Sequence, residues 1–207
     1  GSSDETKIIM DKFKGKINNY KSIGYKINKG KGYAVKKGME VASGKYILFT
    51  DTDLSYGLDT IMKMYEAIKK DSETELLYGS RHHKESDYDE YGITRKIGHL
   101  LFSTYIRTLI LPNVFDTQCG IKIMSKKLAD IASKKLTINR FAFDIELFTI
   151  AKANNLKYSD FPVILETKGS TSIRFIRDTL IMMADILKIR RNHKSGFYKA
   201  DLGKSNP

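Results

Sequence analysis

The sequence predicts an α/β fold in which helices flank a mostly parallel β-sheet. Tyr46 to Phe49 form an uninterrupted apolar run, which is typical of a strand that is covered on both faces. Apolar residues at helical spacing come before this run, at 31–43, and after it, at 58–70. Helices that alternate with buried strands in this way indicate an α/β domain.

Local signals place the remaining elements. A capping-box pattern at 2–5 predicts a helix that runs through Phe13. Ser125 is expected to cap the helix that follows it, and Gly38 to let the helix at 31–43 lie close to the sheet. Further strands are expected at 23–27, 75–80, 121–124 and 161–166, and further helices at 94–111, 125–133, 141–154 and 172–191.

Size and charge limit the functional classes. At 207 residues with 41% apolar content, the chain fits one globular domain. Lys and Arg number 36 and Asp and Glu 24, and the net charge of +12 favours anionic partners such as nucleotide diphosphates or acidic lipid surfaces. The single cysteine, Cys119, excludes an internal disulfide. No apolar run reaches the ~18 residues of a spanning helix, so no transmembrane segment is predicted in this chain.

Two carboxylates follow the apolar run at 46–49, in Asp51-Thr52-Asp53. Side chains two residues apart in extended chain point the same way, so both can meet just beyond the carboxyl end of the strand. Open α/β sheets bind ligands there. Hard oxygen donors without a neighbouring His or Cys suit Mg²⁺ or Mn²⁺ shared with a substrate diphosphate. A simple turn after a strand is the alternative that this pattern alone leaves open.

A longer series of motifs surrounds these carboxylates. It comprises Asn28, Gly30-Lys31-Gly32, Ala42-Ser43-Gly44, the strand at 46–49 and Asp51-Thr52-Asp53. In this order the motifs resemble those of the inverting glycosyltransferases of family 2, and the resemblance implies a GT-A type nucleotide-sugar-binding fold. The Asp53-Leu54-Ser55 continuation is similar to the polyprenyl-phosphate branch of that family. The stretch at 116–122, read as DTQCGIK, resembles a motif of the dolichyl-phosphate glucosyltransferases, from which Ile121 is a mild departure.

The resemblance also implies roles for particular residues. Asp116 is the expected catalytic carboxylate, although an acceptor phosphate is already largely ionised near neutral pH, which leaves an orienting role open. Asp51 and Asp53 are expected to bind Mg²⁺ or Mn²⁺. Asp144 is interpreted first as a helix cap or a buried hydrogen-bond acceptor. The other expected site residues bind the nucleotide sugar (Gly30, Lys31, Asp51 and Arg81) or the acceptor (Arg95, His99, Gln118, Arg174 and Arg177).

The first residues, at 1–6, resemble the end of an Asp-Asp-Gly-Ser-x-Asp motif of the same family. On that interpretation the chain begins within the motif and lacks the first strands of the domain; a remnant of an expression tag is the alternative. We therefore expect an N-terminally truncated GT-A domain at 1–171, an amphipathic helix at 172–194 that lies on a membrane surface, and a polar tail at 195–207. Packing on its own domain is the alternative for the helix.

Together these features predict an enzyme that transfers a hexose from a nucleotide sugar to a polyprenyl phosphate with inversion, with UDP-glucose as the favoured donor. The alternatives are a GDP-mannose-using member of the same family and an inactive fragment that binds a nucleotide sugar. Scattered positive charge without a recognition motif argues against a nucleic-acid partner. The expected location is peripheral, on the cytoplasmic side of a membrane.

Overall fold

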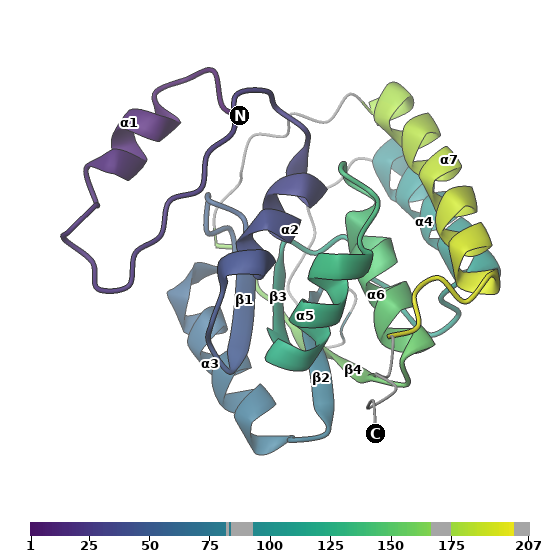
Figure 1. Cartoon of the computed structure of the whole chain (residues 1–207). Coiled ribbons are helices and arrows are strands. Elements are labelled where there is room, and N and C mark those ends of the chain that lie inside the picture. Colours follow the sequence, from purple (N-terminus) through teal and green to yellow (C-terminus); the bar gives the residue numbers. More distant parts are fainter. Residues whose placement is uncertain (82, 84–92, 167–174, 201–207) are drawn as a thin grey trace, which may run out of the picture.

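The computed structural model describes residues 1–81, 83, 93–166 and 175–200, and for 93–99 and 175–176 it gives only the course of the backbone. Helices flank a central sheet (Figure 1), so the α/β class expected from the sequence is confirmed. In chain order the elements are α1 (Thr6–Asp11), α2 (Lys31–Val41), β1 (Tyr46–Thr50), α3 (Gly57–Lys70), β2 (Thr74–Ser80), α4 (Ile93–Leu109), β3 (Ile121–Ser125), α5 (Lys126–Lys135), α6 (Phe143–Ala153), β4 (Lys157–Pro162) and α7 (Phe175–Lys194).

The strands of the described residues form one sheet in the order β1-β3-β2-β4. β3 runs antiparallel to both of its neighbours, and β2 and β4 are parallel. The sheet is therefore mixed, whereas the sequence predicted a mostly parallel sheet. The apolar pattern of a strand reports its burial and not its direction, which is why the sequence did not reveal this. The register pairs Thr50, the last residue of β1, with Ile121, the first residue of β3. We call this end of the sheet, where β1 and β2 end and β3 begins, the rim.

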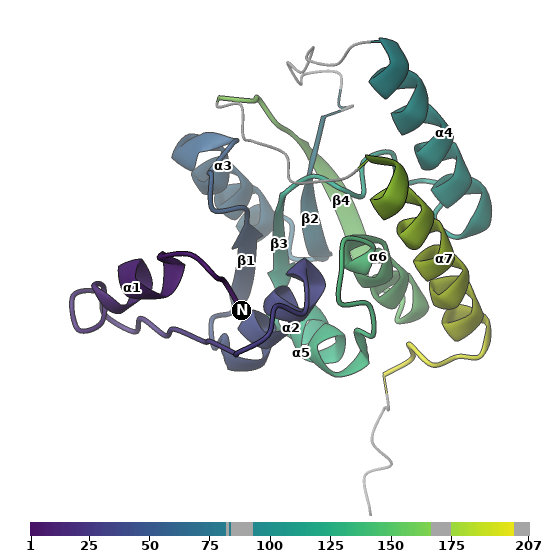
Figure 2. The same cartoon turned by 90° about the horizontal axis from the view of Figure 1, so that it is seen from above.

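Two hydrophobic clusters hold helices to the two faces of the sheet (Figure 2). Helices α2, α4, α5, α6 and α7 contribute to the larger cluster, and α3 contributes to the smaller one. Side chains of β3 alternate between the clusters: Ile121 and Ile123 join the smaller one, whereas Met124 joins the larger. Lys122 lies in the same strand and is fully buried. A charged side chain therefore stands inside the core.

Three local predictions are wrong. Residues 23–27 form no strand, and Ile27 is 72% exposed, because no strand of the described chain pairs with this segment. Helix α1 begins at Thr6 rather than within a capping box at 2–5, because the Asp4 carboxylate accepts hydrogen bonds from the backbone and the hydroxyl of Thr6. Nothing lies within 4 Å of a Cβ placed on Gly38, so this glycine is not needed for a close approach to the sheet.

Two predicted strands differ from the structure in detail. β1 is at the edge of the sheet and Leu48 is 40% exposed, so this strand is not covered on both faces. β4 begins at Lys157, ahead of the predicted range 161–166, because its parallel pairing with β2 starts opposite Thr74.

The C-terminal helix α7 packs on the domain through one side and exposes another. Met182, Ile186 and Ile189 are buried in the larger cluster. Leu180 and Leu187 are 63% and 53% exposed. None of the helices in the described ranges is long and apolar enough to cross a bilayer.

The segment at 195–200 also differs from its prediction as part of a polar tail. Tyr198 is fully buried, and its ring stands edge-to-face on Phe197 with centroids 5.4 Å apart. Asn154, at the end of α6, donates from its side chain to the carbonyl of Tyr198 at 2.8 Å and accepts from the N–H of Ala200 at 2.6 Å. These residues are therefore fastened to the domain, whereas 201–207 lie outside the described residues.

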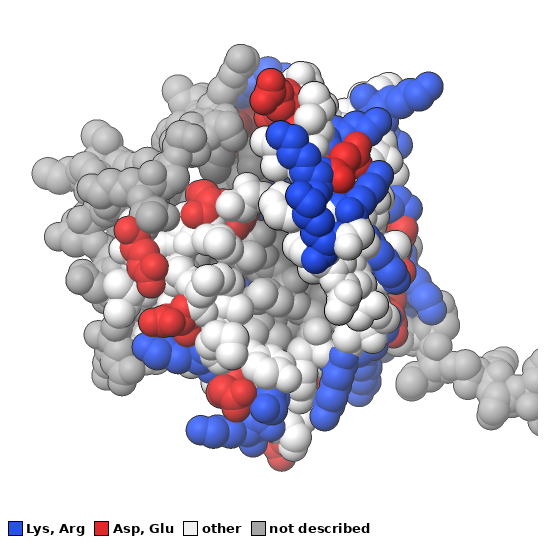
Figure 3. Space-filling model, turned by 90° about the vertical axis from the view of Figure 1, so that its left-hand side faces the viewer, with Lys and Arg blue, Asp and Glu red and all other residues white. Residues whose placement is uncertain are grey.

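Lysines gather on the flank of the molecule that carries α1 (Figure 3). Positive charge on this flank favours the approach of anionic ligands. The exposed lysines among the first thirty residues are Lys7, Lys12, Lys14, Lys16, Lys21, Lys26 and Lys29.

Ser125→Ala should lower stability by about 1 kcal/mol, because the Ser125 hydroxyl accepts a hydrogen bond from the N–H of Leu128 at the start of α5. Thermal unfolding should show a Tm lower by about 2–4 °C. Ser133→Ala is the matched control, since Ser133 lies inside the same helix, where alanine has the higher helix propensity. An equal fall in Tm for both variants would contradict the capping role.

Candidate active site

Three chain segments meet at the rim because β3 is antiparallel to its neighbours. Asp51 follows β1, Arg81 follows β2, and Gly120 precedes β3. The backbone N–H of Asp51 donates to the carbonyl of Gly120 at 3.1 Å. A Cβ placed on Gly120 would lie 2.2 Å from the Asp51 carboxylate, so a side chain at this position would displace the carboxylate. Glycine at 120 thereby lets Asp51 stay at the rim.

The glycine-rich turn before α2 brings a lysine to this carboxylate. Gly30 has a φ of +101°, which residues with a side chain rarely adopt, and its N–H donates to the side chain of Asn28 at 2.9 Å. Helix α2 then begins at Lys31, whose Nζ lies 2.6 Å from Oδ1 of Asp51. Exposed fractions of 30% and 43% leave both side chains accessible to a ligand. Three residues expected to bind the nucleotide sugar are thus neighbours.

Asp53 lies in the turn after β1 and is exposed. Its carboxylate accepts a hydrogen bond from the N–H of Ser55 at 3.2 Å, and Leu54 between them has a φ of +48°. Asp51 and Asp53 thus present hard oxygen donors from one short turn, which fits Mg²⁺ or Mn²⁺ that complete their coordination with phosphate oxygens and water. The described part of the chain contains no group of three His, Cys, Asp or Glu side chains that would hold a metal ion alone.

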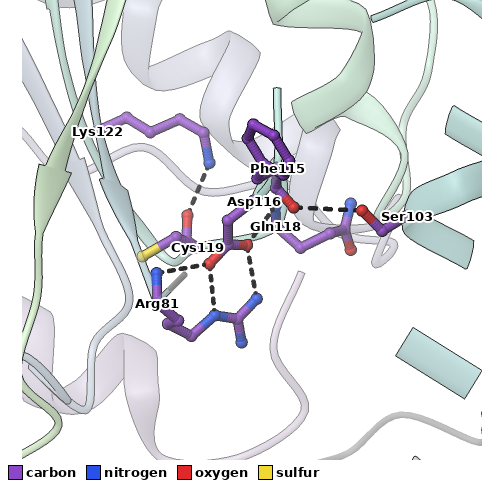
Figure 4. A network of polar contacts seen from close by, with 7 residues as sticks. All are labelled: Arg81, Ser103, Phe115, Asp116, Gln118, Cys119 and Lys122. Carbon is purple, nitrogen blue, oxygen red and sulfur yellow. Dashed lines mark hydrogen bonds and ion pairs between the residues drawn. The ribbon is translucent and has the colours of Figure 1, made fainter. Parts of the chain in front are cut away.

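Asp116 and Arg81 form a buried ion pair at the rim (Figure 4). Nε and Nη2 of Arg81 donate to the two carboxylate oxygens at 2.7 and 2.8 Å, and the Arg81 backbone N–H donates to Oδ2 at 3.0 Å. The exposed fractions of the two side chains are 14% and 0%. Burial by itself lowers the pKa of Arg81, but the adjacent Asp116 carboxylate raises it, and the pKa lies well above its usual value. The guanidinium is therefore charged and fixed in orientation.

Gln118, from the same loop, extends its side chain towards Ser103 of α4 (Figure 4). Its Nε2 is buried and has no hydrogen-bond partner among the described residues. An unpaired buried donor costs about 1–3 kcal/mol, and a ligand that offers an acceptor oxygen would remove this cost. Gln118 borders a small cavity between this loop and α4, which is lined further by Phe102, Ser103, Ile106, Val114, Phe115, Asp116 and Thr117.

A second buried ion pair lies beneath the rim. Lys122 donates to Oδ1 of Asp144 at 2.6 Å and to the carbonyl of Cys119 at 2.7 Å. Burial raises the pKa of Asp144, and the positive charges of Lys122 and Lys31 oppose that rise. The Nζ atoms of Lys122 and Lys31 lie 5.2 and 5.4 Å from the ring centroid of Phe49. One aromatic ring therefore connects the buried pair with the lysine at the rim.

The structure places only part of the expected acceptor site. Gln118 shares the rim with Arg81 and Asp116, whereas Arg177 is exposed on α7. The remaining three expected residues have no described side chain: Arg95 and His99 belong to α4 where only the backbone is given, and Arg174 lies outside the described residues.

Sequence reasoning missed three buried polar residues, Lys122, Glu146 and Tyr198. A signal existed for Lys122, because a lysine in the middle of an apolar strand needs a buried carboxylate partner. Asp144 is that partner, so its interpretation as a buried acceptor is confirmed; it is not a cap, because Ala142 holds the position before α6. Tyr198 stands in a polar stretch that offers no comparable signal.

Asp51, Arg81 and Asp116 lie together at the rim. Polar groups gathered at strand ends are typical of α/β domains that bind a ligand there. Residues 1–131 match the model of Glycosyl transferase family 2, and the chain belongs to this family. The dolichyl-phosphate beta-glucosyltransferase of Dictyostelium discoideum is 28% identical over 205 residues, which cover 96% of this chain and 63% of that protein. The protein of the same name from Homo sapiens is 27% identical, over 97% of this chain and 64% of its own length. The chain thus spans slightly less than two thirds of these relatives.

Solved structures share the fold. Glucosyl-3-phosphoglycerate synthase from Mycobacterium tuberculosis in complex with UDP has a TM-score of 0.60 at 15% identity, over 98% of this chain and 68% of that chain. The complex of that enzyme with Mn²⁺, UDP-glucose and phosphoglyceric acid also has a TM-score of 0.60 at 15% identity. This likeness confirms the GT-A type fold that the sequence motifs imply.

Lys122→Met should destabilise the protein by about 3–5 kcal/mol near pH 7, because it leaves the Asp144 carboxylate buried without its cation. The loss should be smaller near pH 4. A carboxyl group whose pKa is raised by folding holds its proton more tightly in the folded chain, so its destabilising effect is absent well below its unfolded pKa, grows as pH rises from the unfolded to the folded pKa, and is constant above that.

Urea unfolding of both proteins at the two pH values measures this difference. The double variant Lys122→Met/Asp144→Leu is the control. It also removes the Asp144 carboxylate, which the single variant leaves buried without a cation, and should therefore recover much of the stability. A loss that is the same at both pH values, or is not relieved in the double variant, would show that the pair does not act through its charge.

Proposed function

We propose that the protein transfers glucose from UDP-glucose to a polyprenyl phosphate of the dolichyl type, with inversion at the anomeric carbon. The observation that carries the proposal is that two ion pairs, Lys31–Asp51 and Arg81–Asp116, lie together at the rim. They lie in a family 2 chain whose relatives include proteins named dolichyl-phosphate beta-glucosyltransferase. The first group suits the donor diphosphate and the second suits the acceptor phosphate.

On the donor side, Lys31 and the turn that follows β1 face the diphosphate. Asp51 and Asp53 are the residues that would hold Mg²⁺ or Mn²⁺, and the ion would supply positive charge against the departing UDP. Lys31 already neutralises Asp51 at 2.6 Å and adds a second cation for the phosphates. Gly30 lets the backbone of the turn come close to the same ligand.

On the acceptor side, a phosphate oxygen attacks the anomeric carbon while the bond from that carbon to the UDP oxygen breaks. The second pKa of a phosphate monoester is about 6, so the nucleophile is ionised near neutral pH and no side chain has to remove a proton. Both oxygens of Asp116 are bonded to Arg81, which suits an orienting role. The sequence motifs assign Arg81 to the nucleotide sugar, but its pairing with Asp116 beside Gln118 favours the acceptor side instead. Asp116 therefore holds the Arg81 guanidinium towards the acceptor phosphate, and Nε2 of Gln118, which has no hydrogen-bond partner among the described residues, donates to that phosphate.

The acceptor lipid requires the site to lie near a membrane. Exposed apolar side chains occur on α7, at Leu180 and Leu187, and on α4, at Leu100 and Leu101. Both views of the fold place α4 and α7 on the same flank (Figures 1 and 2). An apolar helix surface with nearby cations such as Arg177 suits the interface of an anionic leaflet. We assign this flank to peripheral binding on the cytoplasmic side of a membrane.

The direct test offers the chain radiolabelled UDP-glucose, Mn²⁺ and dolichyl phosphate in vesicles, and measures label that enters the lipid phase. Transfer that stops with chelator and is weak with GDP-mannose is the expected result. Preferred transfer from GDP-mannose would reassign the donor. Saturable binding of UDP-glucose without transfer to any polyprenyl phosphate would instead identify an inactive nucleotide-sugar-binding module.

Lys31→Met should separate donor binding from metal binding. The lysine competes with a metal ion for Asp51, so Mn²⁺ alone should bind the variant up to about fivefold more tightly, the range of a partly exposed ion pair. UDP-glucose should bind about tenfold more weakly, because a charge-assisted contact to phosphate is lost. Calorimetric titration with each ligand measures both effects. Lys29→Met, which removes an exposed lysine beside the turn, is the control. Unchanged UDP-glucose affinity in the Lys31 variant would remove this residue from the donor site.

Gln118→Leu should raise the KM for polyprenyl phosphate by about tenfold and leave the KM for UDP-glucose unchanged, because one donor to the acceptor phosphate is lost. Thermal stability should not fall, since the change replaces an amide whose buried Nε2 has no partner among the described residues by an apolar group of similar size. Steady-state kinetics with each substrate varied, together with Tm, provide the measurement. A large fall in Tm with both KM values unchanged would show that the amide serves the fold alone.

A further inference from the structure

Glu146 of α6 is a fully buried carboxylate whose two oxygens accept four hydrogen bonds. Oε2 accepts from the backbone N–H groups of Thr137 and Ile138 at 2.9 and 2.8 Å. Oε1 accepts from the hydroxyl of Thr137 at 2.7 Å and from the hydroxyl of Tyr198 at 2.6 Å. The carboxylate therefore fastens the loop at 136–140 and the segment at 195–200 to one point of the core.

The loop at 136–140 in turn seats the glycine-rich turn that precedes α2. The N–H of Tyr33 donates to the carbonyl of Asn139 at 3.1 Å. A Cβ on Gly30 would lie 2.4 Å from that same carbonyl oxygen, and a Cβ on Gly32 would lie 2.5 Å from the carbonyl oxygen of Ile138. The turn and the loop are thus in direct backbone contact. A shift of the loop would move the first turn of α2 and, with it, Lys31.

Within the described residues 195–200, Tyr198 supplies the hydrogen bond to Glu146. Burial and the adjacent Glu146 carboxylate raise the pKa of its phenol, so the group keeps its proton and donates. Asn192 of α7 contacts the same phenolic oxygen at 3.3 Å. The contacts therefore run without a gap from α7 through Tyr198 and Glu146 to the loop, and from the loop to the turn that carries Lys31.

We infer that Tyr198 and Glu146 are positioning residues for the donor site, which they serve by holding Lys31 at Asp51 through the loop at 136–140. The described hydrogen bonds of both side chains go to the loop at 136–140, to α7 and to each other, and a buried carboxylate that bonds two backbone N–H groups is strongly directional. The inference that this geometry serves donor binding rests on the proposed function. The mechanical link between Tyr198 and the turn does not, and it is measurable without substrate.

Tyr198→Phe removes the hydroxyl and keeps the ring, so it is the test variant. Hydrogen exchange of the ligand-free chain should become about fivefold faster or more at 31–34 and at 137–140, as expected for the loss of one hydrogen bond to a charged group. Tyr158→Phe is the matched control. Tyr158 of β4 packs on Phe148 of α6, the helix that carries Glu146, with ring centroids 5.6 Å apart, and it has no carboxylate in hydrogen-bond contact among the described residues. Exchange at 31–34 that is unchanged in Tyr198→Phe, or equally faster in the control, would overturn the inference.

Steady-state kinetics should show that the variant changes the KM for one substrate and not for the other. In Tyr198→Phe the KM for UDP-glucose should rise about fivefold, while the KM for polyprenyl phosphate stays within twofold of the parent value. A merely structural role would lower the amount of active enzyme and leave both KM values unchanged, which would overturn positioning. If the parent chain transfers no glucose at all, the proposed function fails, and the exchange measurement alone then decides whether Tyr198 positions the turn.

Discussion

The antiparallel pairing of β3 with β1 is the constraint on which the candidate site depends. If β3 ran parallel to β1, its first residues would lie at the opposite end of the sheet, and the loop at 116–120 would be a full strand length away from Asp51. The observed register instead sets Gly120 against Asp51, with an N–H to carbonyl distance of 3.1 Å. The absence of a side chain at 120 leaves the space that the carboxylate occupies. Strand direction and one glycine thus decide which polar groups meet.

At the rim and beneath it, the domain buries charged groups and pairs them closely. Lys122 with Asp144 and Arg81 with Asp116 are ion pairs in which almost nothing is exposed, and Glu146 has hydrogen-bond donors on both oxygens. Such groups contribute little net stability compared with an apolar core, because their desolvation offsets most of the attraction. What they supply is geometry, since a buried charge tolerates few alternative arrangements of its partners. These buried polar groups therefore position the site residues more than they stabilise the fold.

The sequence predicts those features of the fold that depend on neighbouring residues. The cap at Ser125 and the strand at 46–49 each depend on neighbouring residues, and both are found at the predicted positions, although the strand lies at the edge of the sheet. Strand direction and the paired Asp116 depend on contacts far apart in the chain, which spacing does not reveal. The same holds for Tyr198, whose burial follows from where α7 ends rather than from the polar residues around it.

Helix α7 has a further consequence through its two apolar stripes. The buried stripe of Met182, Ile186 and Ile189 and the exposed stripe of Leu180 and Leu187 lie on nearly opposite sides, about 150° apart at 3.6 residues per turn. The inner stripe prevents the helix from rolling about its own axis. A lipid layer that took up the outer stripe would therefore set the tilt of the entire domain, and with it the height of the rim above the headgroups. On the proposed function, a phosphate held too deep or too far out would miss the site whatever its chemistry, so the distance that the site can reach would help to select the acceptor.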